Sequence, residues 1–366
     1  MIAQLTRRQT IAALLAIRVT RPAVAFHYAA LFSASEVRWY SRFELLVTGG
    51  ILSLQQSAML RQGGSRLIAY EWCSGFYAGD WVSAAEIWQK QVKPDWLLTR
   101  EPVTGAAAEG GKLAHWYDFA NPNLIAARAA YLAGLLANSG YNGYFFDTPG
   151  FESLPPPAQE AFRASHPGLD YNRCLGDFFG ALRRQLPAGK LIFTNQGYRH
   201  ADYFLPHADL DLTESYFTYI KDGATKLRPW HDPEKPWESI RTPMVELVGK
   251  AEKKWPRVRF VHVNYAAGPS EEAALYGYAA AKLFGHEAYL IVPSSTSAEQ
   301  NPVYSTSLGR PLSANYEEDA AAGAVWRRYE NGVVALFSGS KPFLIPATKV
   351  TLRTPGRGYV VTGSSV

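Results

Sequence analysis

The chain has 366 residues and a mass of 40.5 kDa, enough for one large domain with an appendage or for two ordinary domains. Its hydrophobic content of 47% and charged content of 19% exclude a disordered protein. The net charge is +5, yet Lys and Arg form no long block, so we expect no nucleic-acid partner. The eight histidines and two cysteines show no metal-binding spacing, so we expect no metal and no cofactor.

The amino terminus differs from the rest of the chain. Arg7 and Arg8 precede a short apolar run, residues 11–17, an arrangement that resembles a twin-arginine export signal. The run is too short to span a bilayer. We therefore predict that residues 1–21 form an export signal or amino-terminal extension and that the protein is periplasmic or extracellular. An amphipathic first helix is the alternative.

In an exported protein Cys73 and Cys174 could form a disulfide; otherwise they are two buried thiols.

From residue 22 onward, short apolar strands alternate with segments of helical period. The predicted strands are residues 23–28, 43–47, 66–71, 143–147, 190–195, 211–214, 257–265 and 287–292. The predicted helices are residues 55–62, 82–91, 121–139, 158–186 with a break near 166–168, 199–207, a stretch ending near 254, and 271–284. Eight such units match a (β/α)₈ TIM barrel in number and in length. A doubly wound open sheet is the alternative, but no Gly-rich dinucleotide fingerprint follows the first strand.

The carboxyl-terminal part has a different pattern. Residues 324–329 and 333–337 are two apolar runs separated by Asn331-Gly332, which is typical of a β-hairpin. Residues 349–352 and 359–362 add two short strands. We therefore predict a barrel domain over residues 22–304 and a small antiparallel β appendage over residues 305–366.

Side chains at the carboxyl ends of barrel strands share one site. Asp147 and Glu214 stand out because each ends an apolar strand, the fourth and the sixth. Hydrolysis of a glycosidic bond needs two such carboxyl groups. Asn195 ends the strand between them and could bind a sugar hydroxyl or hold one carboxylate in place. The residues that we predict to bind substrate are Tyr28, Glu71, Trp72, Asp118, Asn195, Gln196, Tyr216, Asn264 and Tyr265.

Several of these residues also have a purely structural interpretation. Glu71 could be the first residue of the long segment after the third strand. Asp118 shortly precedes Asn121-Pro122, where a helix cap is expected. Glu214 could cap the turn that follows it, and Asn195-Gln196-Gly197 is turn composition. His27, inside an apolar strand, is more typical of a core histidine. Taken singly, the structural interpretation is favoured for all but Asp147 and Glu214.

Three motifs carry a resemblance to a known family. GYNGYFFD at residues 140–147 resembles the strand-four signature of the endo-α-1,4-polygalactosaminidase-like glycoside hydrolases. FTNQG at residues 193–197 and DLTESYF at residues 211–217 resemble later segments of that group. WRRYENGVV at residues 326–334 looks more like a related group of hypothetical glycosyl-hydrolase-like TIM-barrel proteins with a β extension. The resemblance implies that Asp147 and Glu214 are the catalytic pair.

The sequence departs from the family pattern at two points. Asn142 stands where the family usually has Asp, and Thr148-Pro149-Gly150 stands where a second acidic residue is common. Both departures leave the catalytic pair intact.

We therefore expect a retaining glycoside hydrolase that acts on an α-linked polysaccharide or oligosaccharide, with Asp147 as nucleophile and Glu214 as general acid and base. A retaining mechanism requires carboxyl groups about 5–5.5 Å apart, and an inverting one about 6.5–9.5 Å. A carbohydrate-binding protein without turnover is the first alternative. A phosphate-handling lyase is a weaker one, because residues 266–270 are a poor anion-binding loop and no predicted strand ends in Lys.

Overall fold

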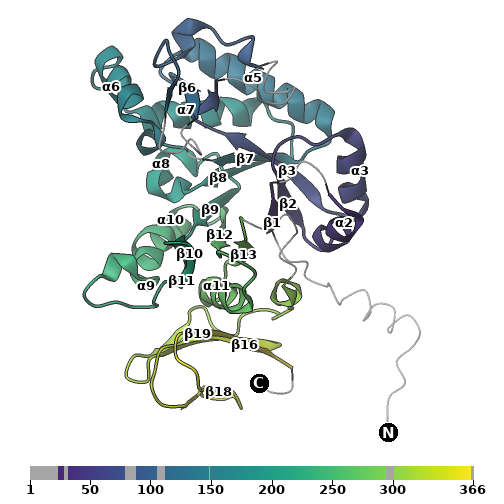
Figure 1. The fold of residues 1–366 in the computed structure, drawn as a ribbon, viewed down its shortest axis with the longest axis vertical. Helices are drawn as coiled ribbons and strands as arrows, with labels where there is room; N and C mark the ends of the chain where they lie inside the picture. The colour runs from purple at the N-terminus through teal and green to yellow at the C-terminus, as the bar shows by residue number, and fades with distance from the viewer. Residues whose placement is uncertain are drawn as a thin grey trace.

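In the computed structural model, a parallel sheet of eight strands forms a nearly closed barrel (Figure 1). The structure describes residues 24–28, 32–78, 88–104, 112–147, 149–293 and 301–363. The predicted export signal, residues 1–21, lies outside them. In spatial order the strands are β1 (Val24–His27), β2 (Leu45–Thr48), β3 (Arg66–Trp72), β7 (Gly143–Asp147), β8 (Leu191–Asn195), β9 (Leu210–Glu214), β12 (Arg259–Tyr265) and β13 (Glu287–Ile291). All eight predicted strands are confirmed, with small shifts at their ends.

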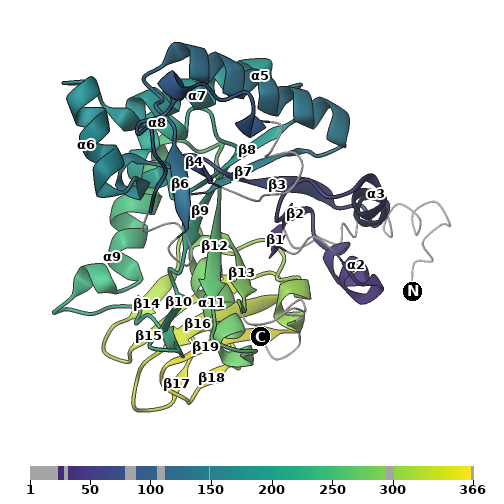
Figure 2. The same ribbon diagram turned by 45° about the horizontal axis from the view of Figure 1, so that its top comes forward.

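Helices follow the strands and cover the outside of the barrel (Figure 2). They are α2 (Ala34–Tyr40), α3 (Leu54–Gln62), α5 (Pro122–Ser139), α6 (Pro156–Ser165), α7 (Tyr171–Gln185), α8 (Ala201–Phe204), α9 (Arg241–Pro243), α10 (Gly249–Lys254) and α11 (Glu271–Phe284). The sequence signals explain their ends. Proline begins α5, and Gly140, at φ 75°, ends it in the left-handed conformation that glycine adopts without a Cβ clash. None of the described helices is long and apolar enough to cross a membrane.

Aromatic side chains fill the inside of the barrel. The rings of Phe26 and Phe145 lie 5.7 Å apart between centroids, and Phe193 lies 5.0 Å from Phe145. Tyr289 on β13 lies 6.2 Å from Phe26 on β1, so side-chain packing connects the two edge strands. Because these strands are buried on both faces, they are apolar along their whole length, which is the pattern from which the sequence analysis recognised them.

The long segment between β3 and α5 forms a small sheet of its own. Its strands are β4 (Gly75–Tyr77), β5 (Val103–Thr104) and β6 (Leu113–Trp116), with β6 in the middle. Part of the helix predicted over 82–91 lies outside the described residues, and only Trp88 and Gln89 of the rest are helical.

Cys73 is buried and Cys174 half-buried, and the two are free cysteines rather than a disulfide.

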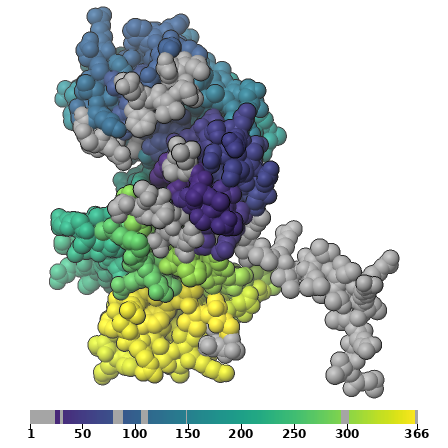
Figure 3. All heavy atoms as spheres, turned by 45° about the vertical axis from the view of Figure 1, so that its right-hand side comes forward, coloured from purple at the N-terminus to yellow at the C-terminus, as the bar shows by residue number. Residues whose placement is uncertain are grey.

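The carboxyl-terminal appendage is antiparallel, as predicted. Its main sheet contains β14 (Glu317–Asp319), β15 (Ala324–Tyr329), β16 (Gly332–Phe337) and β19 (Arg357–Thr362); β17 (Phe343–Leu344) pairs with β18 (Thr351–Leu352). The sheet lies directly against α11, where a Cβ on Gly358 would come within 2.5 Å of the Tyr276 backbone. The appendage therefore forms one end of an elongated molecule, packed on the last helix of the barrel (Figure 3).

Candidate active site

Three polar side chains end three neighbouring strands of the barrel. Asp147 ends β7, Asn195 ends β8 and Glu214 ends β9, and β8 pairs with both of the other strands. Parallel strands bring their carboxyl ends to the same rim of a barrel. The sequence reasoning placed these residues there, and the structure brings them together.

One nitrogen atom joins the two acidic side chains. Asn195 Nδ2 donates a hydrogen bond of 2.7 Å to Asp147 Oδ1 and another of 2.7 Å to Glu214 Oε2. Since each oxygen lies 2.7 Å from the same nitrogen, the two oxygens are at most 5.4 Å apart. We call Asp147 and Glu214 the carboxylate pair.

Two tyrosines bind the other oxygens of the carboxylate pair. Tyr70 on β3 donates from its hydroxyl to Asp147 Oδ2 at 2.8 Å, and Tyr265 on β12 donates to Glu214 Oε1 at 2.6 Å. All four carboxylate oxygens therefore accept a hydrogen bond, which is the arrangement that fixes a carboxylate in one orientation. Tyr265 was predicted; Tyr70 was missed, although it lies two residues before Trp72 and so on the same face of its strand.

The surroundings of Glu214 shift its pKa upward. Burial, followed by the negative charge of Asp147, raises the pKa of Glu214, while the hydrogen bonds from Tyr265 and Asn195 oppose this increase. Burial also raises the pKa of Tyr70 and of Tyr265, and the neighbouring carboxylates add to it. Both tyrosines are therefore neutral hydrogen-bond donors at ordinary pH.

A buried acid holds the chain just after Asn195. Asp211 is fully buried and accepts hydrogen bonds from Thr194 Oγ1, at 2.7 Å, and from the backbone N–H groups of Gly197 and Tyr198, at 2.7 and 2.8 Å. A Cβ at Gly197 would come within 2.8 Å of Asp211 Oδ1, so no larger residue fits there. Burial raises the pKa of Asp211 to about 7. Sequence reasoning missed this residue; the only signal was an acid next to the apolar core of a strand.

Aromatic rings line the rim beside Asp147. Trp72 pairs in register with Asp147, and its ring lies 4.7 Å from that of Tyr77 and 5.1 Å from that of Trp116. Tyr28 lies edge-on to Tyr70 at 5.5 Å and is 41% exposed. Burial, then the charges of Asp147 and Glu214, raise the pKa of the Tyr28 hydroxyl. Trp72 therefore lies beside Asp147 in the sheet, and Tyr28 packs against Tyr70.

Two residues predicted to bind substrate point away from the carboxylate pair. Glu71 forms an ion pair with the buried Arg128 of α5. Asn264 is buried and its Oδ1 accepts from the backbone N–H groups of Phe217 and Thr218, at 3.2 and 3.1 Å. Each lies one residue from a side chain that does reach the site, Tyr70 or Tyr265, and successive side chains of a strand face opposite sides. Glu71 and Asn264 therefore support the fold rather than the site, a correction to the sequence analysis.

Three further predicted residues make contacts elsewhere in the described structure. Asp118 accepts from the Ala120 backbone N–H at 3.1 Å and pairs with His166 at 2.8 Å, while Asn121 is the N-cap of α5. Gln196 is half-buried in the left-handed conformation, at φ 56°. Tyr216 is half-buried, and its carbonyl accepts from Arg228 Nε at 2.8 Å.

His27, for which the sequence favoured a core position, is half-buried at the end of β1. Its ring lies 4.7 Å from that of Phe32, and Nε2 lies 3.5 Å from Glu36.

Among the described residues, no group of three or more His, Cys, Asp or Glu side chains is arranged to hold a metal ion.

Glycoside hydrolases are among the solved structures that this chain resembles. The glycoside hydrolase domain of PelA from Pseudomonas aeruginosa superimposes with a TM-score of 0.51 at 21% identity, over 74% of this chain and 95% of that domain. A maltogenic α-amylase, AmyB from Thermotoga neapolitana, has a TM-score of 0.49 at 11% identity, covering 86% of this chain and 84% of that one. No family model matches the sequence, and no curated protein matches it with significance. At such identities the PelA likeness establishes the fold: a TIM barrel of the kind found in that hydrolase domain.

Proposed function

We propose that the protein is a glycoside hydrolase that cleaves an α-linked glycan with retention of configuration. The observation that carries the proposal is the single Asn195 nitrogen bridging Asp147 and Glu214, which limits their nearest oxygens to 5.4 Å or less. That limit supports the roughly 5–5.5 Å carboxyl separation of retaining enzymes over the roughly 6.5–9.5 Å of inverting ones. It also argues against a binding protein without turnover, for which we expected widely separated or outward-facing carboxylates.

Asp147 is the nucleophile in this proposal and Glu214 the general acid and base. Glu214, with its raised pKa, donates its proton to the glycosidic oxygen as the bond to the anomeric carbon breaks. Asp147 attacks the anomeric carbon and forms a glycosyl ester. Glu214 then takes a proton from water, the resulting hydroxyl attacks the anomeric carbon, and the ester breaks to release Asp147 as the carboxylate.

The surrounding side chains have supporting roles. Tyr70 and Asn195 hold Asp147 in a fixed orientation for attack, while Tyr265 and Asn195 do the same for Glu214. Trp72 and Tyr28 offer aromatic surface at the rim, on which the C–H face of a sugar ring can pack. The α linkage and a relationship to the polygalactosaminidase-like hydrolases rest on the sequence motifs at residues 140–147, 193–197 and 211–217.

The test is a hydrolysis screen on α-linked polysaccharides and amino-sugar polymers, with products identified by mass and the anomer released first identified by NMR. We expect retention of configuration, and loss of hydrolysis in Asp147→Asn and Glu214→Gln with unchanged folding. Asp177→Asn, on the exposed side of α7, is the matched control. Full activity in either site variant would disprove the assignment, and an inverted first product would disprove the nucleophile.

We also propose that the protein is exported by means of residues 1–21, based on Arg7-Arg8 and the apolar run that follows. Fusing residues 1–30 to a reporter that functions only after twin-arginine export tests this. Export that persists after Arg7 and Arg8 are both replaced by Lys would disprove it.

A further inference from the structure

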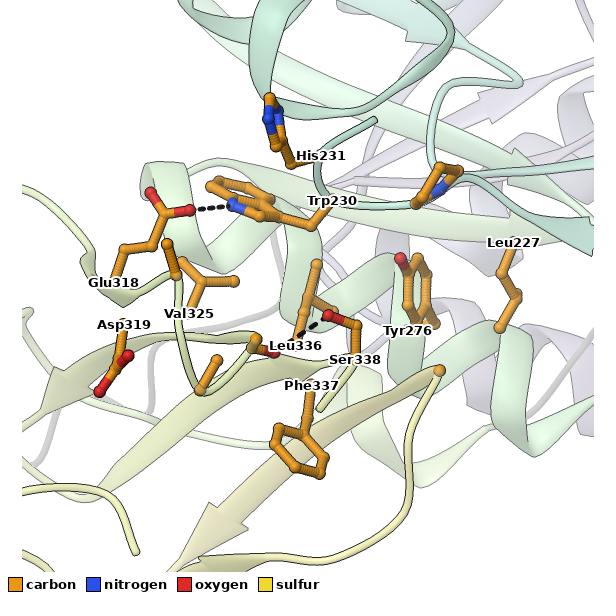
Figure 4. Close-up of a pocket in the computed structure, with 15 residues that line it drawn as sticks. Leu227, Trp230, His231, Tyr276, Glu318, Asp319, Val325, Leu336, Phe337 and Ser338 are labelled. Carbon is orange, nitrogen blue, oxygen red and sulfur yellow. Dashed lines mark hydrogen bonds between the residues drawn. The ribbon is translucent and has the colours of Figure 1, made fainter. Parts of the chain in front are cut away.

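A cavity of about 340 Å³ lies between the barrel and the carboxyl-terminal appendage. The barrel contributes Trp230, in the segment after β11 (Ala224–Leu227), and Tyr276 on α11. The appendage contributes Glu318 on β14 and Ser338, which directly follows β16 (Figure 4). The cavity shares no residue with the carboxylate pair or its hydrogen-bond partners, and its volume lies in the range of small-molecule sites, about 300–1,000 Å³.

Trp230 is held rigidly at the edge of this cavity. Its ring lies edge-on to Tyr316 at 5.0 Å and 5.7 Å from that of Phe284, while the residue as a whole is only half-buried. The indole Nε1 donates to Glu318 Oε1 at 3.0 Å. An aromatic ring with fixed orientation and accessible surface provides contact area at little entropic cost.

Glu318 is oriented by two partners and still reaches the cavity. Besides the bond from Trp230, its Oε2 lies 3.6 Å from Arg241 Nε, and its side chain is 25% exposed. Arg241 offsets the charge of Glu318, so the carboxylate is a hydrogen-bond acceptor without a strong preference for a cation.

Two further polar groups lie on the appendage side. Ser338 is exposed, and its hydroxyl donates to the Gly323 carbonyl at 3.2 Å, which leaves the oxygen able to accept. Asp319 Oδ1 accepts from the Ala322 backbone N–H at 2.9 Å and so fixes the turn beside the cavity. The lining therefore combines an aromatic face with oriented oxygen acceptors.

We propose that this cavity, which we call the interdomain pocket, binds a neutral oligosaccharide segment, as a glycan-binding site separate from the catalytic one. A pyranose presents an apolar C–H face that packs on an aromatic ring and a rim of hydroxyls that donate to carboxylate and hydroxyl oxygens. The proposal builds on the proposed glycosidase function. The pocket would keep a glycan chain attached to the enzyme, and so raise its concentration near the carboxylate pair.

Binding is measured by calorimetry on the full chain carrying Asp147→Asn, so that nothing is hydrolysed. The probes are neutral oligosaccharides: maltoheptaose, an α-linked galactan fragment and an N-acetylhexosamine oligomer. We expect one of them to bind, and Trp230→Ala to weaken that binding about two- to thirteenfold, because an aromatic contact contributes about 0.5–1.5 kcal/mol.

Two further variants make the test specific. Ser338→Tyr fills the interdomain pocket from an exposed position without removing packing, and it should abolish binding to the pocket while thermal unfolding is unchanged. Trp237→Ala, at an exposed tryptophan (57%) outside the pocket, should leave the affinity unaltered. If no neutral probe binds, or if Trp230→Ala and Ser338→Tyr bind as tightly as the parent, the proposal is wrong. Because binding is measured without turnover, this result is independent of whether the wild type hydrolyses a glycan.

Discussion

Replacing Asn195 with Ala tests the central feature of the site, because one nitrogen serves both carboxylates. The nearest oxygens of Asp147 and Glu214 lie at most 5.4 Å apart. At that separation two ionised carboxylates repel each other by about 3 kcal/mol or more, for an effective dielectric constant of about 20. The two hydrogen bonds from Asn195 offset this repulsion, and Ala offers no donor.

We expect two effects of Asn195→Ala. The hydrogen bond from Asn195 lowers the pKa of Glu214, so its removal raises that pKa further. The general acid then stays protonated to higher pH, and the alkaline limb of the pH–activity curve moves upward. The carboxylates also move apart, and since a misplacement of about 1 Å can cost about 10²-fold in rate, kcat should fall about 10- to 100-fold with a smaller change in KM.

The assay is kcat and KM between pH 4 and pH 10, with the glycan that the wild type hydrolyses. Asn138→Ala is the matched control, because Asn138 is exposed and bonds only to its own helix, at Gly134. A variant with the alkaline limb of the wild type and less than a twofold loss in kcat would refute the bridging role of Asn195.

Three further predictions follow from the same contacts. Tyr265→Phe removes one donor from Glu214 and should move the alkaline limb upward without displacing the nucleophile; a shift to lower pH would contradict this. Asp147→Ala should lose activity and regain part of it with azide, giving a glycosyl azide of inverted configuration; no azide product would exclude Asp147 as nucleophile. The pKa of Asp211 is raised to about 7, so between about pH 4 and pH 7 the folded protein retains a proton that the unfolded chain has lost. As the pH rises across that interval, the free energy of unfolding of the wild type should therefore fall by up to about 4 kcal/mol relative to that of Asp211→Asn. Urea unfolding at several pH values measures this difference. Equal pH dependence in both proteins would contradict the prediction.

The strand pattern could be predicted from the sequence because it depends on local chemistry. Each barrel strand is a short apolar run, and helix boundaries are marked by residues such as Pro122 and Gly140. Asp147 and Glu214 were identifiable because each is the last residue of a predicted strand, in a chain whose eight strands meet at one rim.

What the tertiary structure decided is which neighbours of those acids face them. Tyr70 and Glu71 are adjacent in the sequence, yet one donates to Asp147 and the other pairs with Arg128 on α5. A strand buried on both sides carries no polar face to mark its inward side, so the phase of its alternation is set only when it pairs within the barrel. The bridge from Asn195 to both carboxylates likewise exists only because β8 lies between β7 and β9. The sequence by itself determined the fold class and the two acids, while the tertiary structure determined the tyrosines, the bridge and the buried Asp211, because these depend on pairing between strands far apart in the chain.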